Sequence, residues 1–338
     1  MMGTKKTIGF LAAGLSAAMM LIGAGASSAA DTWRLGSMMP PDSAEGKGYE
    51  KFAQLASKYT NGKIRIQIYP SSQLGKMDAM VEQLSANIVQ VVGSNAAFLA
   101  KWVPDINYMT APFLFADQEH WKRFMETDLV KGWFEKVEDE AGIMVLGSIP
   151  DFPRGTYRVL VSKKPIQTPD DIKGIKVRQF ANELIVDVWQ HLGAEVRVMG
   201  WNEVYDGINR GIVEAVTSPA ELVESMRFYE VAPYVVRTNE YPQGIAFMVN
   251  KKTFRALPPD IQEGLVRAHK EASAYEVSLL QSSLGASLKR IEAKGAKYSE
   301  SVDIGALMNK AEEYYRMKEA EGKLPKGFLD TVIATRNP

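Results

Sequence analysis

The chain has 338 residues, a length typical of two domains, and 46% of them are hydrophobic, which excludes a disordered or fibrous protein. Its 40 basic and 40 acidic side chains give no net charge, whereas nucleic-acid binding needs a surplus of Lys and Arg. The absence of cysteine excludes disulfides, thiolate zinc ligands and cysteine nucleophiles.

The first thirty residues predict a cleaved signal peptide. Lys5 and Lys6 precede an apolar run over residues 8–26, and the small residues Ser28 and Ala30 follow where a cleavage site expects them. A membrane anchor is the alternative, but Gly and Ala crowd the end of the run and no basic cluster follows it. We expect cleavage after Ala30, or four residues earlier, and a mature protein outside the cytoplasm.

Strand and helix patterns alternate in the first part of the mature chain. Residues 63–69 carry Ile at every second position, which gives one buried and one wet face and is typical of a strand. Asn61 and Gly62 end the preceding helix, because glycine permits a left-handed backbone. The β-α-β-α-β order predicts a layered α/β domain. Its predicted strands are 33–38, 63–69 and 88–92, and its predicted helices are 43–59 and 76–86.

A second α/β unit follows Gly142. Its predicted strands are 143–149, 157–162, 174–178, 194–199, 213–217, 231–238 and 244–250, and its predicted helices are 182–192 and 202–209. No repeat and no low-complexity linker separates the two units, so we expect the chain to cross between them several times. Residues 258–293 then predict one long helix, because proline opens the segment and apolar residues recur at steps of three and four. Its length of roughly 50 Å would span both units, and Gly285 is a point where it can bend.

Motifs of the common enzyme classes are missing. The sequence has no phosphate-binding loop, no dinucleotide-binding glycine motif, no His-Glu-x-x-His and no Gly-x-Ser-x-Gly. Its three histidines, His120, His191 and His269, are far apart, so we expect no metal, no cofactor and no catalytic residue. A site for an organic anion remains, since Arg178 ends a predicted strand, Arg158 lies near the start of another, and arginine holds a carboxylate through two parallel hydrogen bonds.

Several motifs in fixed order resemble one family, the periplasmic solute-binding proteins of tripartite ATP-independent periplasmic (TRAP) transporters, of the C4-dicarboxylate-binding (DctP) type. The motifs cover nearly all of the mature chain: SKYTNGKI at 57–64, YPSSQLG at 69–75, APFLF at 111–115, TPDDIKGIKVR at 168–178, LGA at 192–194, WNEVY at 201–205 and LPP at 257–259. The resemblance implies a two-lobed α/β fold with a central ligand cleft and a long helix spanning both lobes.

The resemblance also implies roles for single residues. Arg178 matches the arginine that pairs with the substrate carboxylate, and Arg158 matches a second arginine near it. Trp201 stands where an aromatic ring packs on the carbon skeleton of the ligand, with ordinary core packing as the alternative. Ser218 falls where an asparagine often binds ligand. Asn95 stands where sialic-acid-binding members carry an acidic residue, so sialic acid is not expected.

We therefore expect a periplasmic solute-binding protein, a monomer, that captures a small organic acid and delivers it to the small and large membrane subunits of a TRAP importer. By resemblance, lobe one comprises residues 31–155 and 244–283, and lobe two comprises 156–243 and 284–338. An extracytoplasmic enzyme acting on a carboxylic acid is one alternative, which the lack of histidine near the arginine-bearing strands disfavours. A binding protein that serves a sensor or an ATP-driven importer is the other.

Overall fold

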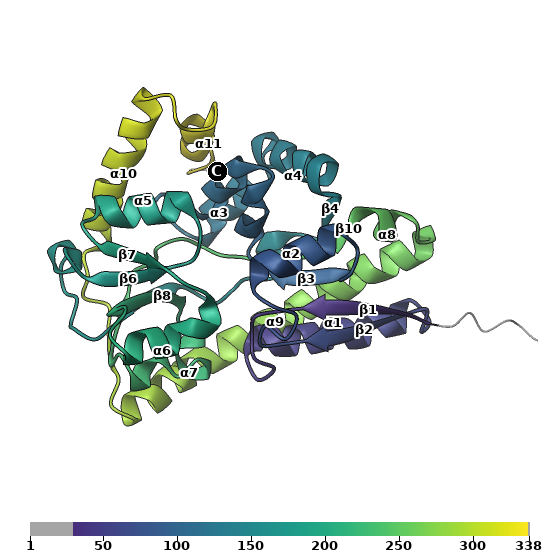
Figure 1. Ribbon diagram of the computed structural model, residues 1–338, viewed down its shortest axis with the longest axis horizontal. Coiled ribbons are helices and arrows are strands. Elements are labelled where there is room, and N and C mark those ends of the chain that lie inside the picture. The colour runs from purple at the N-terminus through teal and green to yellow at the C-terminus, as the bar shows by residue number, and fades with distance from the viewer. Residues whose placement is uncertain (1–29, 337–338) are drawn as a thin grey trace, which may run out of the picture.

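The computed structural model describes residues 30–336, so the expected signal peptide, apart from Ala30, lies outside the described residues. Two α/β units, each built on its own sheet, lie side by side (Figure 1). Within residues 30–336, no helix is both long and apolar enough to cross a membrane.

The first sheet has the strand order β2-β1-β3-β10-β4. β1, β2 and β3 run parallel, whereas β10 runs antiparallel to both of its neighbours. The alternating isoleucines of β2 bury Ile64 and pack Ile66 and Ile68 against the core, which confirms the predicted strand. Its elements are β1 (Asp31–Gly36), α1 (Ala44–Tyr59), β2 (Ile64–Tyr69), α2 (Met77–Ser85), β3 (Val91–Ser94), α3 (Gln118–Met125), α4 (Asp128–Ala141), β4 (Ile143–Leu146), β10 (Ala246–Asn250) and α8 (Lys251–Arg255).

The second sheet has the order β11-β9-β5-β8-β6-β7, in which β5 is antiparallel to β8 and β9. Its elements are β5 (Arg158–Ser162), β6 (Lys176–Gln179), α5 (Glu183–His191), β7 (Glu195–Val198), α6 (Val204–Asn209), β8 (Ala215–Pro219), α7 (Leu222–Ser225), β9 (Tyr234–Arg237) and β11 (Lys297–Ser299). Short 3₁₀ helices join the elements of both units: η1 (Ala96–Lys101), η2 (Pro104–Thr110), η3 (Ile149–Asp151), η4 (Pro169–Ile172), η5 (Trp201–Glu203) and η6 (Phe228–Glu230).

Two crossovers between the sheets run next to each other. The first leads from β4 to β5 and the second from β9 to β10, and an isolated bridge pairs Pro153 with Gly244. The Arg154 amide donates to the Gln243 carbonyl oxygen at 2.7 Å. A Cβ atom at Gly244 would lie 2.3 Å from the Ile149 carbonyl oxygen, so the two segments can approach this closely only with glycine there.

The predicted long helix is α9 (Pro259–Ala293), 35 residues that run along both units (Figure 1). Its first turns bury Ile261 and Leu265 in the core of the first sheet, and Ile291 near its other end packs in the core of the second. The helix continues through Gly285. Tyr275 falls on the apolar stripe that the steps of three and four predict, yet it is exposed, and the neighbouring Glu276 is buried where the helix passes from one unit to the other.

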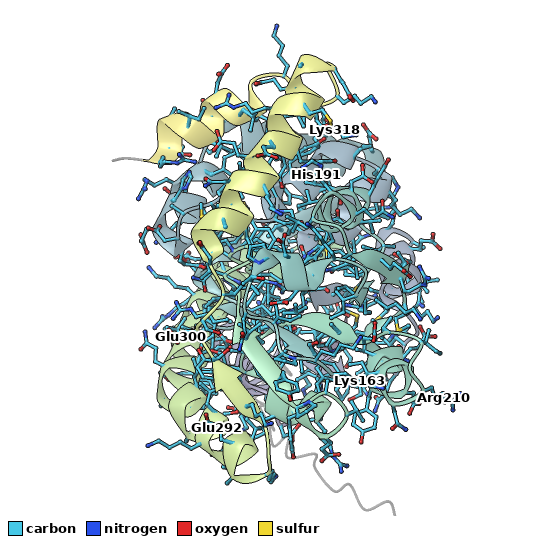
Figure 2. All side chains as sticks on the ribbon, turned by 90° about the vertical axis from the view of Figure 1, so that its left-hand side faces the viewer. Lys163, His191, Arg210, Glu292, Glu300 and Lys318 are labelled. Carbon is cyan, nitrogen blue, oxygen red and sulfur yellow. The ribbon has the colours of Figure 1, made fainter. Side chains whose placement is uncertain are left out.

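The last two helices, α10 (Ile304–Ala320) and α11 (Phe328–Arg336), also reach both units. Figure 2 shows α10 crossing the second unit, with His191 of α5 and Lys318 of α10 near its far end. The chain then turns back, and the carbonyl oxygen of Val332 in α11 lies 2.9 Å from Nε2 of His120 in α3. The C-terminal segment, expected wholly within lobe two, therefore ends on a helix of the first unit.

Candidate ligand-binding site

A cavity of about 340 Å³ lies between the two sheets and draws its lining from both units. This volume is within the range of small-molecule sites. Much of its wall is apolar: Met38, Met39, Met77, Phe98, Phe180 and Trp201. Three arginines, Arg154, Arg158 and Arg178, interrupt that wall. The partners of these arginines determine what the cavity can bind.

Arg178 is buried, with 4% of its surface exposed, and it lines the cavity from β6. Its Nε and Nη2 atoms donate to the carbonyl oxygen of Met199 at 3.0 and 2.8 Å, which fixes the plane of the guanidinium. Among the described residues, no carboxylate lies within ion-pair distance of it. Burial accordingly lowers the pKa of Arg178 to about 9, although the group stays charged at pH 7.

Arg158, on β5, has all three of its nitrogens occupied. Nε pairs with Glu240 at 2.8 Å, Nη1 donates to Gln243 Oε1 at 2.8 Å, and Nη2 donates to Thr217 Oγ1 at 3.0 Å. Its guanidinium carbon also lies 4.3 Å from the ring centroid of Tyr241. Because Glu240 is fully buried beside it, the charge of Arg158 is neutralised within the protein.

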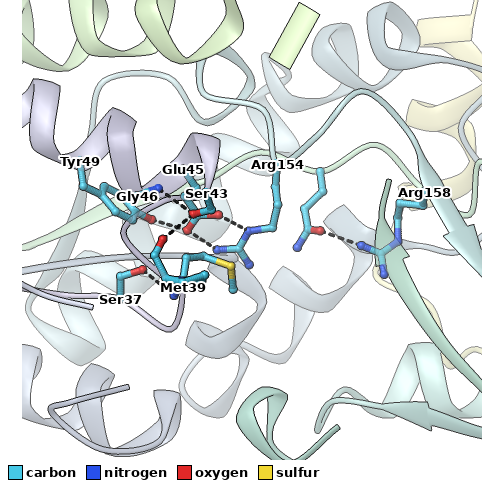
Figure 3. Close-up of polar contacts among 10 residues, drawn as sticks. Ser37, Met39, Ser43, Glu45, Gly46, Tyr49, Arg154 and Arg158 are labelled. Atoms are coloured by element: carbon cyan, nitrogen blue, oxygen red, sulfur yellow. Dashed lines mark hydrogen bonds and ion pairs between the residues drawn. The ribbon is translucent and has the colours of Figure 1, made fainter. Parts of the chain in front are cut away.

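Arg154 stands in the first crossover and is neutralised in the same way. Its Nε and Nη2 atoms form two parallel bonds of 2.7 Å with the carboxylate of Glu45 in α1 (Figure 3). The Tyr49 hydroxyl donates to that carboxylate at 2.5 Å, and Ser43 caps the same helix by accepting from the Gly46 amide. This network fastens the crossover to α1 and places Arg154 at the cavity wall.

Trp201 begins η5 and serves both the cavity and the core. It lines the cavity with 9% of its surface exposed, and its ring lies 5.2 Å from the guanidinium carbon of Arg178. Its other contacts are internal, since it packs edge-on against Phe228 with ring centroids 5.2 Å apart. Trp201 therefore belongs to the core and also faces the cavity, while its contact with a ligand stays a prediction.

Asn95 lines the cavity and is 97% buried, with 3% exposed. Its Oδ1 accepts from the Ala97 amide at 2.9 Å as the cap of η1, while Nδ2 has no hydrogen-bond partner among the described residues. Ser218 lies elsewhere. It is fully buried outside the cavity lining, and its hydroxyl donates to the Pro219 carbonyl oxygen. Its neighbour Thr217 lines the cavity instead, because side chains alternate along β8.

Sequence reasoning missed several lining residues. Lys76 and Glu203 come from opposite units and form an ion pair of 2.9 Å, with 64% and 45% of their side chains exposed. The hydrogen bond from Lys76 lowers the pKa of Glu203. Tyr241 and Gln243 enter from the second crossover. Glu203 lies within the WNEVY motif, but no local pattern shows that these four residues line a cavity, since the tertiary fold alone brings them together.

The three histidines lie apart, as expected from the sequence. His120 contacts α11, His191 packs near Tyr314 of α10, and His269 packs edge-on against Phe247. Within the part of the chain that the structure describes, no group of His, Asp and Glu side chains could hold a metal ion. The geometry is that of a binding cavity with one unpaired arginine.

Comparison with known proteins agrees with this geometry. The DctP family, bacterial extracellular solute-binding protein family 7, matches residues 35–321. The chain belongs to this family. The resemblance seen in the sequence motifs is thereby confirmed, and the chain is a solute-binding protein of the TRAP type.

Among relatives of this solute-binding protein, the C4-dicarboxylate-binding periplasmic protein DctP of Rhodobacter capsulatus is 31% identical over 239 residues, 70% of each chain. A TRAP periplasmic solute-binding protein of Sulfitobacter sp. NAS-14.1, solved with bound β-D-galacturonate, is 26% identical with a TM-score of 0.81, over 91% of this chain and 100% of the other. One from Roseobacter denitrificans OCh 114, with bound L-galactonate, is 25% identical with a TM-score of 0.80, over 90% and 98%. These likenesses confirm the two-lobed fold with its long helix.

Proposed function

We propose that this protein captures a small organic acid in the cavity between its lobes and delivers it to the membrane subunits of a TRAP importer, without chemical change. The single observation that carries the proposal is Arg178, a buried cation that lines the cavity without a carboxylate partner. Leaving such a charge unpaired is costly, and a ligand carboxylate would pay that cost. The relatives named above bind C4-dicarboxylates, galacturonate and galactonate, all of which carry a carboxylate.

We assign the carboxylate to the edge of Arg178 formed by Nη1 and Nη2. The adjacent edge, Nε and Nη2, donates to the Met199 carbonyl oxygen, so the guanidinium is oriented before a ligand arrives and the second hydrogen of Nη2 stays available. Trp201 would then pack on the carbon skeleton next to the carboxylate. Arg158 would act indirectly, holding Thr217 and Tyr241 in place at the wall.

The paired crossovers supply a hinge for closure. We propose that the lobes, 31–155 with 244–283 and 156–243 with the segment from 284, rotate about the bridge between Pro153 and Gly244. We place the end of lobe two before α11, because α11 packs on α3 of the first unit. Closure would exclude water from Arg178 and strengthen its ion pair with the ligand.

The test begins with a thermal-shift screen of organic acids, since a ligand at 100 times its dissociation constant stabilises the folded state by about 2.7 kcal/mol. Calorimetry with the best acid then compares the wild type with Arg178→Lys and Arg178→Ala. Lysine keeps the charge but loses the planar fork, so binding should weaken. Alanine should weaken it further, by about two to four decades, because a buried carboxylate without its partner costs about 3–5 kcal/mol.

Arg197 provides the matched control. It lies beside Arg178 in register on β7, but it is exposed and pairs with Glu195. Arg197→Ala should bind the acid as the wild type does. Equal affinities for the wild type and both Arg178 variants would contradict the carboxylate assignment. Chemical analysis of the acid after incubation tests for turnover, and recovery of a changed compound would indicate an enzyme.

A further inference from the structure

We infer that the cavity selects a monoanion, a ligand with one carboxylate and an uncharged polar remainder, and that it discriminates against dicarboxylates. The inference rests on the proposed function, since it assumes that Arg178 binds the first carboxylate. It concerns the other end of the ligand, and it follows from how the charges around the cavity are already paired.

Most of the charged side chains that line the cavity are neutralised within the protein. The charged lining residues are Lys76, Asp78, Arg154, Arg158, Arg178 and Glu203. Lys76 pairs with Glu203, and the two buried arginines other than Arg178 pair with carboxylates behind the wall. Both of those arginine pairs lie at 2.7–2.8 Å and are at least nine-tenths buried, so ligand binding cannot release them cheaply.

The charges that remain are Arg178 and Asp78. Asp78 is exposed in the first turn of α2 and forms no ion pair with another described residue. A single carboxylate on Arg178 therefore balances the buried charge of the cavity. A second carboxylate would find no uncommitted cation among the described lining residues and would meet Asp78 at the rim.

The lining also carries uncharged hydrogen-bond donors. Asn95 has its oxygen committed to the Ala97 amide, so only its Nδ2 donor is available to a ligand. Tyr241 lines the same cavity, and its hydroxyl bonds to no other described residue. Burial raises the pKa of Tyr241 to about 12, which keeps the phenol proton in place at neutral pH. Neutral donors of this kind match hydroxyl or carbonyl oxygens, whereas a dehydrated carboxylate needs a cation or several donors.

The test uses pairs of acids that share a carbon skeleton and differ only in oxidation of the far end. Galactonate is compared with galactarate, gluconate with glucarate, and butyrate with succinate, by calorimetry at pH 7. In any pair whose monoacid binds, we expect the diacid to bind at least 100-fold more weakly. A diacid that binds as tightly as its monoacid, or more tightly, would overturn the inference.

The variant Arg178→Ala distinguishes a failure of the monoanion inference from a failure of the proposed function. If a diacid binds tightly and Arg178→Ala abolishes its binding, the carboxylate site is right and the monoanion inference is wrong. If acids bind equally well to Arg178→Ala, the proposed function itself is wrong. If monoacids alone bind and lose their affinity in Arg178→Ala, both are supported.

A designed change of specificity gives a second readout. Asp78→Lys places a cation at the rim, where the second carboxylate of a bound diacid would lie. We expect Asp78→Lys to lower the ratio of the diacid dissociation constant to the monoacid dissociation constant at least tenfold. Ala79→Lys introduces a lysine at the neighbouring exposed position outside the lining and should leave the ratio unchanged. Equal ratios in both variants would show that charge at the rim does not set selectivity, contrary to the inference.

Discussion

Burial of a charged side chain has opposite consequences in this protein according to whether a partner is present. Arg154 and Arg158 are held by carboxylates at 2.7–2.8 Å and serve as fixed parts of the wall. Arg178 is equally buried but bonds to the Met199 carbonyl oxygen. A carbonyl oxygen offsets part of the desolvation cost but does not neutralise the positive charge. An anion that binds next to Arg178 is therefore stabilised.

Glu276, in α9, is the acidic counterpart of Arg178. It is 1% exposed, its Oε2 has no hydrogen-bond partner among the described residues, and burial raises its pKa to about 9, with Glu45 and Glu221 adding to the shift. The folded chain thus keeps a proton that the unfolded chain releases above its ordinary pKa of 4.5. The free energy of unfolding therefore falls as pH rises between about 5 and 9.

We predict that Glu276→Gln flattens this fall, because glutamine is neutral at every pH. Thermal melts at pH 5.5, 7 and 8.5 should show a smaller drop in Tm for the variant than for the wild type. Glu263→Gln, at an exposed position of the same helix, is the control and should follow the wild type. Parallel curves for Glu276→Gln and the wild type would show that Glu276 is ionised in the folded state.

Sequence reasoning pointed to Arg178, but it did not show that Arg178 lacks the carboxylate partner that the other two cavity arginines have. A place at one end of a strand and the family resemblance both point to this residue, and they point to Arg158 as well. What separates the two is Glu240, which lies 82 positions from Arg158 along the chain. No local pattern announces a pair of that kind, so only the folded structure shows which arginine is uncommitted.

Among the elements, those with a strong period were predicted well. The alternating isoleucines of β2, the apolar face of α5 and the long stripe of α9 each contribute one face to a hydrophobic core. The segment 96–141 and the helices after residue 300 gave no comparable signal. Their 3₁₀ turns and short helices are fixed by contacts with distant parts of the chain, as where Phe124 of α3 packs against Phe328 of α11.

Strand pleating explains the one site residue that lies away from the cavity. Motif alignment pointed to Ser218, but neighbouring residues of a strand face opposite sides. On β8 the side that meets the cavity carries Thr217, whose hydroxyl accepts from Arg158. A displacement of one position along a strand is therefore enough to exchange a ligand-facing side chain for a core one.

The ion pair between Lys76 and Glu203 connects the segment before α2 with η5 across the two units. Because both side chains are largely exposed, the pair should contribute little to folding stability and act mainly on ligand release. We predict that Lys76→Met raises the dissociation rate of the bound acid about two- to fivefold in stopped-flow measurements, with little change in Tm. Higher ionic strength should raise the wild-type rate toward that of the variant.

Lys101→Met is the control for that experiment. Lys101 pairs with Glu82, but both residues belong to the first unit, so breaking their contact leaves the space between the units untouched. The control should release the acid at the wild-type rate. An unchanged rate in Lys76→Met would contradict a role for this contact in holding the lobes together.

At the scale of the whole molecule, the two units are interwoven rather than sequential. The paired crossovers, α9 and the C-terminal helices all join one unit to the other. The proposed motion of the lobes is therefore a rotation about the paired crossovers, because several connections would resist free separation of the units. Neither unit is a continuous stretch of sequence, which is why composition shifts along the chain could not reveal them.

The position of β10 in the sequence determines when the first sheet can be completed during synthesis. This strand lies between β3 and β4, yet it follows β3 by roughly 150 residues. At the usual 5–20 residues per second of synthesis, the centre of the first sheet stays open for about 8–30 s after β3 is made. We expect a fragment of residues 31–244 to be digested rapidly by protease and to lack cooperative unfolding, whereas residues 31–338 resist. A stable first unit in the fragment would contradict this. Because this central strand is made so late, the first sheet cannot be completed until most of the chain has been synthesised.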